Sequence, residues 1–308
     1  MRKSLSFDLA SAIALLLSSL APGNAEEALA PAQPADQVGS AGLTIDVIFD
    51  PSVANAPSGF TAVIEQVVND FETHFTNPIT ITINVGYGKI GGSALPAGAL
   101  GASAAVIESV PYTTLVSSLQ DAETPGASTL PATDPVGGTY WVPAAEARAL
   151  GLDTTEPDVD GFVGFSDAPG LFDFDNRDGV PPDRYDFFGV VAHEFTEIMG
   201  RMLFVGEKMA GSPKSYDVLD LLHFSSPGKR IFTEAPGYVS VDNGATNINS
   251  FNTVPGGDAG DWAGNTLDAF NAFGAKGVLE PISNGDLAVM NALGWALAAP
   301  LPLPSPAP

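Results

Sequence analysis

The chain has 308 residues, of which 45% are hydrophobic, so it can bury a sizeable core in one large domain or in two smaller lobes. Its 36 acidic and 12 basic residues give a net charge of -24, which argues against nucleic acid or an anionic membrane surface as a partner. It contains no cysteine, so we expect core packing and bound ions, not disulfides, to stabilise it.

The N-terminal residues have the layout of a secretory signal peptide. A basic start precedes an apolar run over residues 9–20, and small residues at 23–25 resemble a cleavage site. We therefore expect a signal peptide over 1–25 and a flexible, Pro/Ala-rich lead-in over 26–42. The apolar run is too short to span a bilayer, so we expect a mature protein that is not inserted in a membrane and is secreted or periplasmic in a bacterium.

Periodic apolar patterns predict an α/β arrangement in the first half of the chain. Apolar and polar residues alternate over 79–85, which predicts a strand with one buried face, and shorter strands are predicted over 43–49 and 161–166. Helical spacing follows Ser58, a candidate N-cap. The predicted helices cover 60–75, 112–122, 143–150 and 186–201.

The stretch 186–201, DFFGVVAHEFTEIMGR, is predicted to form a helix with Asp186 as its N-cap. His193 and Glu197 are four residues apart and share one helix face, so they can hold one metal ion while Glu194 lies beside it. The pattern is H-E-x-x-E instead of H-E-x-x-H, and a carboxylate oxygen remains an acceptable zinc ligand. For this pattern alone, the alternative is a helix whose His and Glu pair on its solvated side.

Acidic and aromatic loops follow in the rest of the chain. The block 173–179, DFDNRDG, resembles a calcium loop but has one residue too many for the EF-hand spacing, so calcium is a secondary candidate and we favour an acidic turn. A short apolar element is predicted over 216–222, strands over 230–233 and 238–241, and a last helix over 285–297.

A catalytic zinc takes three protein ligands and leaves one position for water, so His193 and Glu197 need a third partner. Sequence spacing alone does not choose among the candidates, which are Asp217, Asp220, His223, Asp258 and Asp261.

The segment HEFTEIMG is similar to the H-E-x-x-H-x-x-G segment of metzincin-type metalloproteases, with His193, Glu194 and Gly200 matching and Glu197 departing. Segments spread over about residues 43–296, among them NPITITINVGYG, LDLLHFSSPGKR and GGDAGDWAG, resemble a PEP-CTERM-associated (NF-type) group of secreted bacterial metalloproteases. Within that group the H-E-x-x-E form looks like a recurrent variant.

The resemblance implies a metzincin-like fold of α/β (α+β) class, with a mixed sheet, an active-site helix and an irregular C-terminal lobe. A more distant likeness is to leishmanolysin-type enzymes, in which a His directly before a Trp is the third zinc ligand. It points to Asp261, which precedes Trp262, as the third ligand, with Asp220 as second choice. Glu194 would then be the general base, and its alternative is a helix-surface carboxylate without a catalytic role.

These expectations define one main function and two alternatives. We expect a monomeric zinc endopeptidase acting on protein or peptide substrates, with an N-terminal catalytic lobe over 43–201, a C-terminal lobe over 202–297 and a Pro-rich tail over 298–308. Two carboxylate ligands should weaken the Lewis acidity of zinc and can favour manganese or iron. The alternatives are a non-catalytic secreted metal-binding protein with the same fold and a calcium-stabilised adhesive module.

Overall fold

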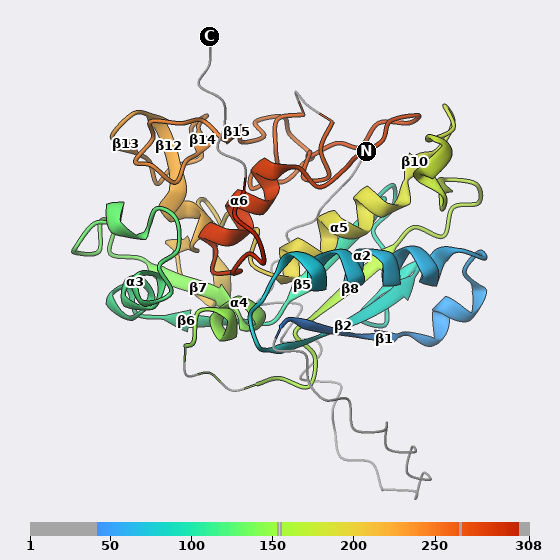
Figure 1. The fold of residues 1–308 in the computed structure, drawn as a ribbon, viewed down its shortest axis with the longest axis horizontal. Helices are drawn as coiled ribbons and strands as arrows, with labels where there is room; N and C mark the ends of the chain where they lie inside the picture. The colour runs from blue at the N-terminus through green and yellow to red at the C-terminus, as the bar shows by residue number, and fades with distance from the viewer. Residues whose placement is uncertain (1–41, 153, 155, 265–266, 302–308) are drawn as a thin grey trace, which may run out of the picture.

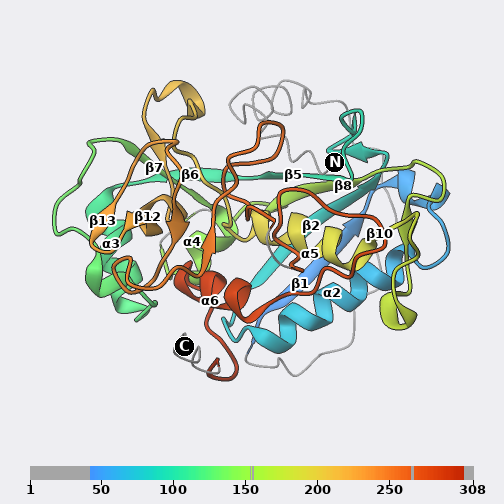
Figure 2. The same cartoon turned by 90° about the horizontal axis from the view of Figure 1, so that it is seen from above.

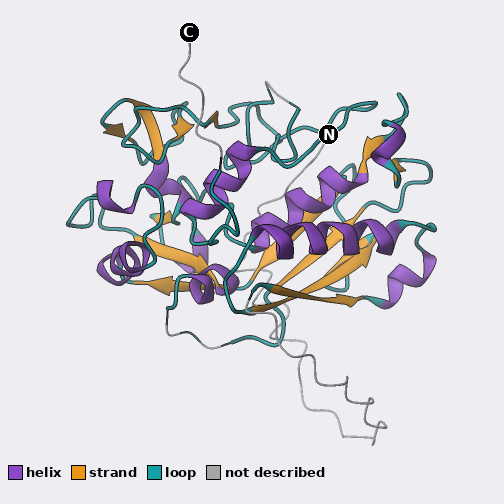
Figure 3. Ribbon diagram, viewed as in Figure 1, coloured by secondary structure: helices purple, strands orange, loops and turns teal. Residues whose placement is uncertain are grey.

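The computed structural model describes residues 42–301 except 153, 155, 265 and 266. The expected signal peptide, nearly all of the lead-in and most of the Pro-rich tail therefore lie outside the described residues. The described chain is a mixed α/β structure with several sheets and few helices (Figure 1, Figure 3). In this part of the chain, no helix has the length and apolar character needed to cross a membrane.

The largest sheet of the first half has the order β1 (Thr44–Phe49), β2 (Thr80–Tyr87), β8 (Gly161–Phe165) and β5 (Gly101–Ala105). The first three strands are parallel, and β5 runs antiparallel to β8 at the edge of the sheet. The alternation in β2 predicted a strand with one buried face, and its apolar residues are fully buried: Ile81, Ile83 and Val85.

Helices α2 (Phe60–His74) and α5 (Phe187–Ile198) lie side by side over one face of this sheet (Figure 1, Figure 2). The prediction of Ser58 as the N-cap of α2 was wrong, because Gly59 occupies that position with φ of 97° and no side-chain cap. This left-handed backbone favours glycine, and a Cβ on Gly59 would lie 3.0 Å from Phe174 Cβ.

Helix α5 is buried on nearly every side, as expected for a helix enclosed between a sheet and a second layer. Asp186 is its N-cap, as predicted, and accepts a hydrogen bond from the Phe188 backbone N–H at 3.1 Å. Gly200, just past the C-terminal end, has φ of 109°, so the chain turns sharply there.

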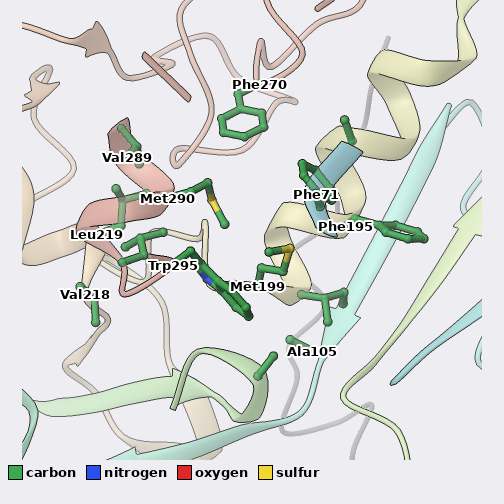
Figure 4. Close-up of a cluster of buried hydrophobic side chains, with 14 of the residues drawn as sticks. Phe71, Ala105, Phe195, Met199, Val218, Leu219, Phe270, Val289, Met290 and Trp295 are labelled. Atoms are coloured by element: carbon green, nitrogen blue, oxygen red, sulfur yellow. The ribbon is translucent and has the colours of Figure 1, made fainter. Parts of the chain in front are cut away.

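The second half packs against the C-terminal end of α5. Helix α6 (Asn284–Ala292) begins after Ser283, its N-cap, and is shorter than the predicted helix because Gly294 takes a left-handed conformation. Beyond it, the Trp295 indole N–H donates to the Met199 carbonyl at 2.7 Å, and both side chains lie in the central apolar cluster (Figure 4). The end of α5 is therefore fixed to the C-terminal part of the core.

Shorter elements complete the fold. The remaining helices are α3 (Tyr112–Asp121) and α4 (Ala144–Ala149), with 3-10 turns η1 (Pro51–Asn55), η2 (Ala127–Thr129), η3 (Asn176–Asp178), η4 (Met209–Gly211) and η5 (Leu219–Leu222). The other strands are β3 (Lys89–Ile90), β4 (Ser93–Ala94), β6 (Ile107–Val110), β7 (Thr139–Pro143), β9 (Phe172–Asp173), β10 (Tyr185–Asp186), β11 (Ser215–Tyr216), β12 (His223–Ser226), β13 (Lys229–Arg230), β14 (Tyr238–Val239) and β15 (Asn249–Ser250).

Candidate metal centre

Three side chains proposed as metal ligands meet in the interior of the protein. His193 and Glu197 come from successive turns of α5, and Asp261 comes from a loop of the C-terminal half. The His193 Nε2 atom lies 3.5 Å from Glu197 Oε1 and 3.4 Å from Asp261 Oδ1. One ligand atom from each residue lies within 4.8 Å of the other two, and all three residues are buried.

The spacing within this His193–Glu197–Asp261 cluster fits a small divalent ion. Ligand atoms bound about 2.0–2.1 Å from a tetrahedral zinc lie about 3.3–3.4 Å from one another. The two distances from His193 Nε2 match this value closely. Asp261 Oδ2 is buried without a hydrogen-bond partner, so this carboxylate retains an acceptor oxygen.

The contacts of the imidazole select the tautomer that a metal requires. His193 Nδ1 lies 2.9 Å from the Ala269 carbonyl oxygen, which can only accept a hydrogen bond. A ring with its proton on Nδ1 offers the lone pair of Nε2 to a metal ion that would lie between Glu197 and Asp261. A backbone carbonyl commonly fixes metal-binding histidines in this way.

Arg201 is part of the same cluster and was not predicted from the sequence. Its Nη1 donates to Asp261 Oδ1 at 2.6 Å, and its Nη2 lies 3.6 Å from Glu197 Oε1. The guanidinium also donates to the His193 carbonyl at 3.2 Å and stacks over the Phe270 ring at 4.4 Å. Arg201 therefore holds both carboxylates in place and balances one of their two negative charges.

These neighbours keep Glu197 ionised despite its position. Burial raises the pKa of Glu197, but His193, Arg201 and a hydrogen bond from Ser103 together lower that pKa to about 2. Ser103 Oγ donates to Glu197 Oε2 at 2.6 Å, which leaves Oε1 directed towards His193. An ionised carboxylate with one oxygen fixed by a hydroxyl is prepared to bind a cation with the other.

Glu194 lies against the edge strand β5. It is fully buried, and a Cβ on Gly101 would lie 2.5 Å from Glu194 Oε1 and 2.7 Å from its Cγ. Gly101 and Ser103 are two residues apart on β5, so they share a face of the strand and contact Glu194 and Glu197 respectively. The absence of a side chain at Gly101 thus makes room for the Glu194 carboxylate against β5.

Hydrogen bonds made by Trp262 hold the loop that carries Asp261 in place. The Trp262 indole N–H donates to Asp286 Oδ1 at 2.8 Å, and the Trp262 backbone N–H donates to the Phe270 carbonyl at 2.9 Å. Because Trp262 follows Asp261 directly, these bonds restrain the third member of the cluster. They connect it to α6, which carries Asp286.

A pocket of about 90 Å³ opens beside the cluster. Glu197, Arg201 and Asp261 form one wall, so the pocket reaches the candidate ligands. A small group bound at the cluster would therefore have an adjoining space.

Asp220, the second choice for the third ligand, lies outside the cluster. Its carboxylate accepts the backbone N–H groups of Phe204 at 3.0 Å, Val205 at 3.2 Å and Asp217 at 2.9 Å. Burial raises the pKa of Asp220 to about 7 and raises the pKa of Asp217 and Glu146 well above their usual range. Asp220 and Asp217 therefore organise a buried turn below the pocket.

The two other candidates also differ from the cluster in their surroundings. His223 is 2% exposed, packs edge-on against Phe251, and has its pKa lowered to about 4 by burial, so it is a neutral core residue. Asp258 lines the pocket, and burial, Asp261 and Glu197 raise its pKa to about 9. Asp258 is thus near the cluster but favours the protonated form.

The acidic block 173–179 is tied to the start of α5. Asn176 Nδ2 donates to Asp186 Oδ1 at 3.0 Å, and Arg177 pairs with Asp175 at 2.6 Å. In the described part of the chain, this block does not bring three acidic or histidine side chains within 4.8 Å of one another. Its described contacts are those of an acidic turn.

Sequence reasoning missed Arg201, Ser103 and Gly101. Arg201 lies four residues after Glu197, and that spacing was visible in the sequence. Ser103 and Gly101 lie in the segment GASAA, which carries no large apolar side chains in alternation and therefore gives no strand signal.

Comparisons with models of known protein families, with curated proteins and with solved structures find no match for this chain.

Proposed function

We propose that this protein is a metal-dependent endopeptidase, with zinc as the ion that best suits the site. The observation that carries the proposal is the buried cluster of His193, Glu197 and Asp261, in which His193 Nε2 lies 3.4–3.5 Å from one oxygen of each carboxylate, as ligand atoms around a tetrahedral zinc would. The H-E-x-x-E helix adds Glu194, the residue type that serves as general base in such sites. The resemblance to metzincin-type proteases points to peptide bonds as the substrate.

In this proposal each residue has a distinct task. A bound zinc ion would supply Lewis acidity and a water molecule of lowered pKa. His193, Glu197 and Asp261 hold it, and Arg201 keeps the two carboxylates oriented. Glu194 accepts a proton at its carboxylate from the attacking water and returns it to the departing amine.

The edge strand β5 provides a place for an extended substrate. Among the described strands, β5 pairs with β8 on one side, and it runs past both Glu194 and Glu197. An extended peptide can form backbone hydrogen bonds with such an edge. This would bring a peptide bond to the cluster and side chains to the pocket.

The signal-like residues 1–25 support an exported protein, since the same pattern directs secretion in bacteria. An acidic, cysteine-free chain is compatible with that setting. We therefore propose that the peptidase acts outside the cytoplasm on protein or peptide substrates.

A direct test combines metal analysis with one isosteric substitution. Purified protein should contain about one zinc per chain, cleave casein, and lose that cleavage on dialysis against a chelator. Glu194→Gln should retain the circular dichroism spectrum and the zinc content but lose cleavage by at least about a hundredfold. Undiminished cleavage by the variant would contradict the role of Glu194, and a lack of bound metal would contradict the proposal as a whole.

A second function is favoured by one contact, the 2.6 Å pair between Arg201 and Asp261. Arg201 supplies positive charge to both carboxylates, so the same cluster can act as a purely structural ion-pair network in a non-catalytic protein. In that case purified protein would fold equally well with or without zinc and would cleave no substrate in a broad panel.

A further inference from the structure

The lining of the pocket beside the cluster is largely apolar, and its charged residues other than Arg201 are acidic. The loop after α5 supplies most of the apolar wall, and the edge strand β5 and Ala259 supply the rest. The apolar members from the loop are Met202, Leu203, Phe204, Val205 and Met209. Phe204 and Met209 are buried together against the neighbouring strands, so this wall is anchored and not a loose loop.

Three further acidic residues line the same pocket, Glu207, Glu234 and Asp258, and of these Asp258 favours the protonated form. The Glu234 side chain packs against the backbone of Gly206. A Cβ added at Gly206 would lie 2.6 Å from Glu234 Cδ. Because Gly206 precedes Glu207 in the chain and has φ of 89°, the turn brings the Glu234 side chain next to the Glu207 loop. Two like charges are thus placed at the same side of one small cavity.

The single basic residue among the described lining residues is Arg201, and it is engaged with Asp261 and Glu197. The described lining therefore contains more acidic than basic side chains. The acidic side chains would repel an acidic ligand, and a neutral polar ligand would not make apolar contacts with the wall.

We propose that this pocket binds the side chain of a lysine or arginine residue of the substrate, next to the bond that is cleaved. The long aliphatic stem of either residue packs along Met202, Phe204 and Met209, and the cationic end reaches Glu207 and Glu234 at the rim. The inference rests on the proposed peptidase function, which brings a peptide to the cluster, and it adds a substrate class to it.

The pocket dimensions agree with this assignment. An apolar cavity of about 150 Å³ holds benzene, so a pocket of about 90 Å³ is in the size range of one side chain. Glu207 and Glu234 are exposed, so each contributes only a modest part of the selectivity. We expect the pair together to give about a tenfold preference for a basic over an uncharged side chain of equal length.

The experiment uses zinc-loaded protein and a mixed peptide library, and mass spectrometry identifies the residues on either side of each cleaved bond. Defined peptides then carry lysine, arginine, norleucine or glutamate at the selected position, and kcat/KM is measured for each. Binding of the lysine and norleucine peptides to the Glu194→Gln variant is measured separately by fluorescence anisotropy. This second readout does not depend on turnover.

The test variant is the double substitution Glu207→Gln and Glu234→Gln. The matched control is Asp121→Asn with Glu123→Gln, which changes the net charge equally at exposed carboxylates at the end of α3. The test variant should lose the preference for the lysine over the norleucine peptide, and the control should keep that preference.

Each outcome separates the two proposals. Equal cleavage of the lysine and norleucine peptides, or a preference that survives the double substitution, would overturn the pocket assignment and leave the peptidase function standing. Absence of all cleavage would overturn the peptidase function. In that case, tighter binding of the lysine peptide that disappears in the double variant still supports the pocket, and equal binding overturns it.

Discussion

Arg201→Met tests the charge balance of the candidate metal centre. In metal-free protein, the arginine is the cation that contacts both Glu197 and Asp261, at 3.6 and 2.6 Å, in a fully buried position. Methionine preserves much of the apolar contact with Phe270 but leaves two buried carboxylates without that cation. Removing one partner of a buried ion pair costs about 3–5 kcal/mol of unfolding free energy, which corresponds to a fall in Tm of about 5–9 °C for a chain of this size.

Thermal unfolding in chelator and in excess zinc measures this effect. Zinc restores positive charge between the carboxylates, so it should raise the Tm of the Met variant by several degrees more than that of the wild type. Arg177→Met is the control, because Arg177 and Asp175 form an exposed pair with side chains 82% and 54% accessible, and we expect almost no change in Tm. Equal zinc-induced shifts in the wild type and the Arg201 variant would refute the reasoning.

Three other changes probe separate parts of the structure. Gly101→Ala places a Cβ 2.5 Å from Glu194 Oε1, so we expect kcat/KM to fall by at least about tenfold with zinc content unchanged; unaltered kcat/KM would contradict this contact. Asp261→Asn should weaken zinc binding by about 10–100-fold in competition with a chromogenic chelator, whereas an unchanged affinity would remove Asp261 from the ligand set. The pKa of Asp220, raised by burial to about 7, makes the folded state bind its proton more tightly than the unfolded state. The unfolding free energy measured in urea should therefore fall as pH rises from about 4 to 7, and Asp220→Asn should flatten this slope.

The main elements of the first half were predictable because their local patterns are strong. Strand β2 alternates apolar and polar residues, and helix α5 combines an Asp N-cap with apolar residues on several faces. Both elements are present in the structure, and the apolar residues that define each pattern are buried. The N-cap of α2 was mispredicted, since the choice between Ser58 and Gly59 depends on contact with Phe174, which is distant in sequence.

Strand β5 shows why the site was harder to predict than the fold. Its sequence, GASAA, has small residues because α5 packs closely against it. Gly101 leaves space for Glu194, and Ser103 donates to Glu197. The small side chains of β5 are explained by its contact with α5. The pattern of apolar and polar residues within the strand carries no information about that contact.

The position of Asp261 illustrates the same limit. Helical spacing alone predicted that His193 and Glu197 share one helix face. It did not distinguish among the five acidic or histidine residues of the second half that could be the third ligand. Asp220 differs from Asp261 only in its surroundings, since its oxygens accept backbone N–H groups of a turn. The resemblance to leishmanolysin-type enzymes, and not spacing, favoured Asp261.

Arg201 alters the expected electrostatics of the centre. A divalent ion held by a neutral imidazole and two carboxylates would have its charge fully balanced, which disfavours ionisation of a bound water. The guanidinium donates to Asp261 and lies close to Glu197, so it would withdraw part of that negative charge from a bound ion. The set of four residues would then carry a net charge of about -1 instead of -2, closer to the neutral three-histidine arrangement that activates water at neutral pH. Glu197 and Asp261 are therefore compatible with the proposed zinc site when the arginine accompanies them, and the proposal does not require a harder ion.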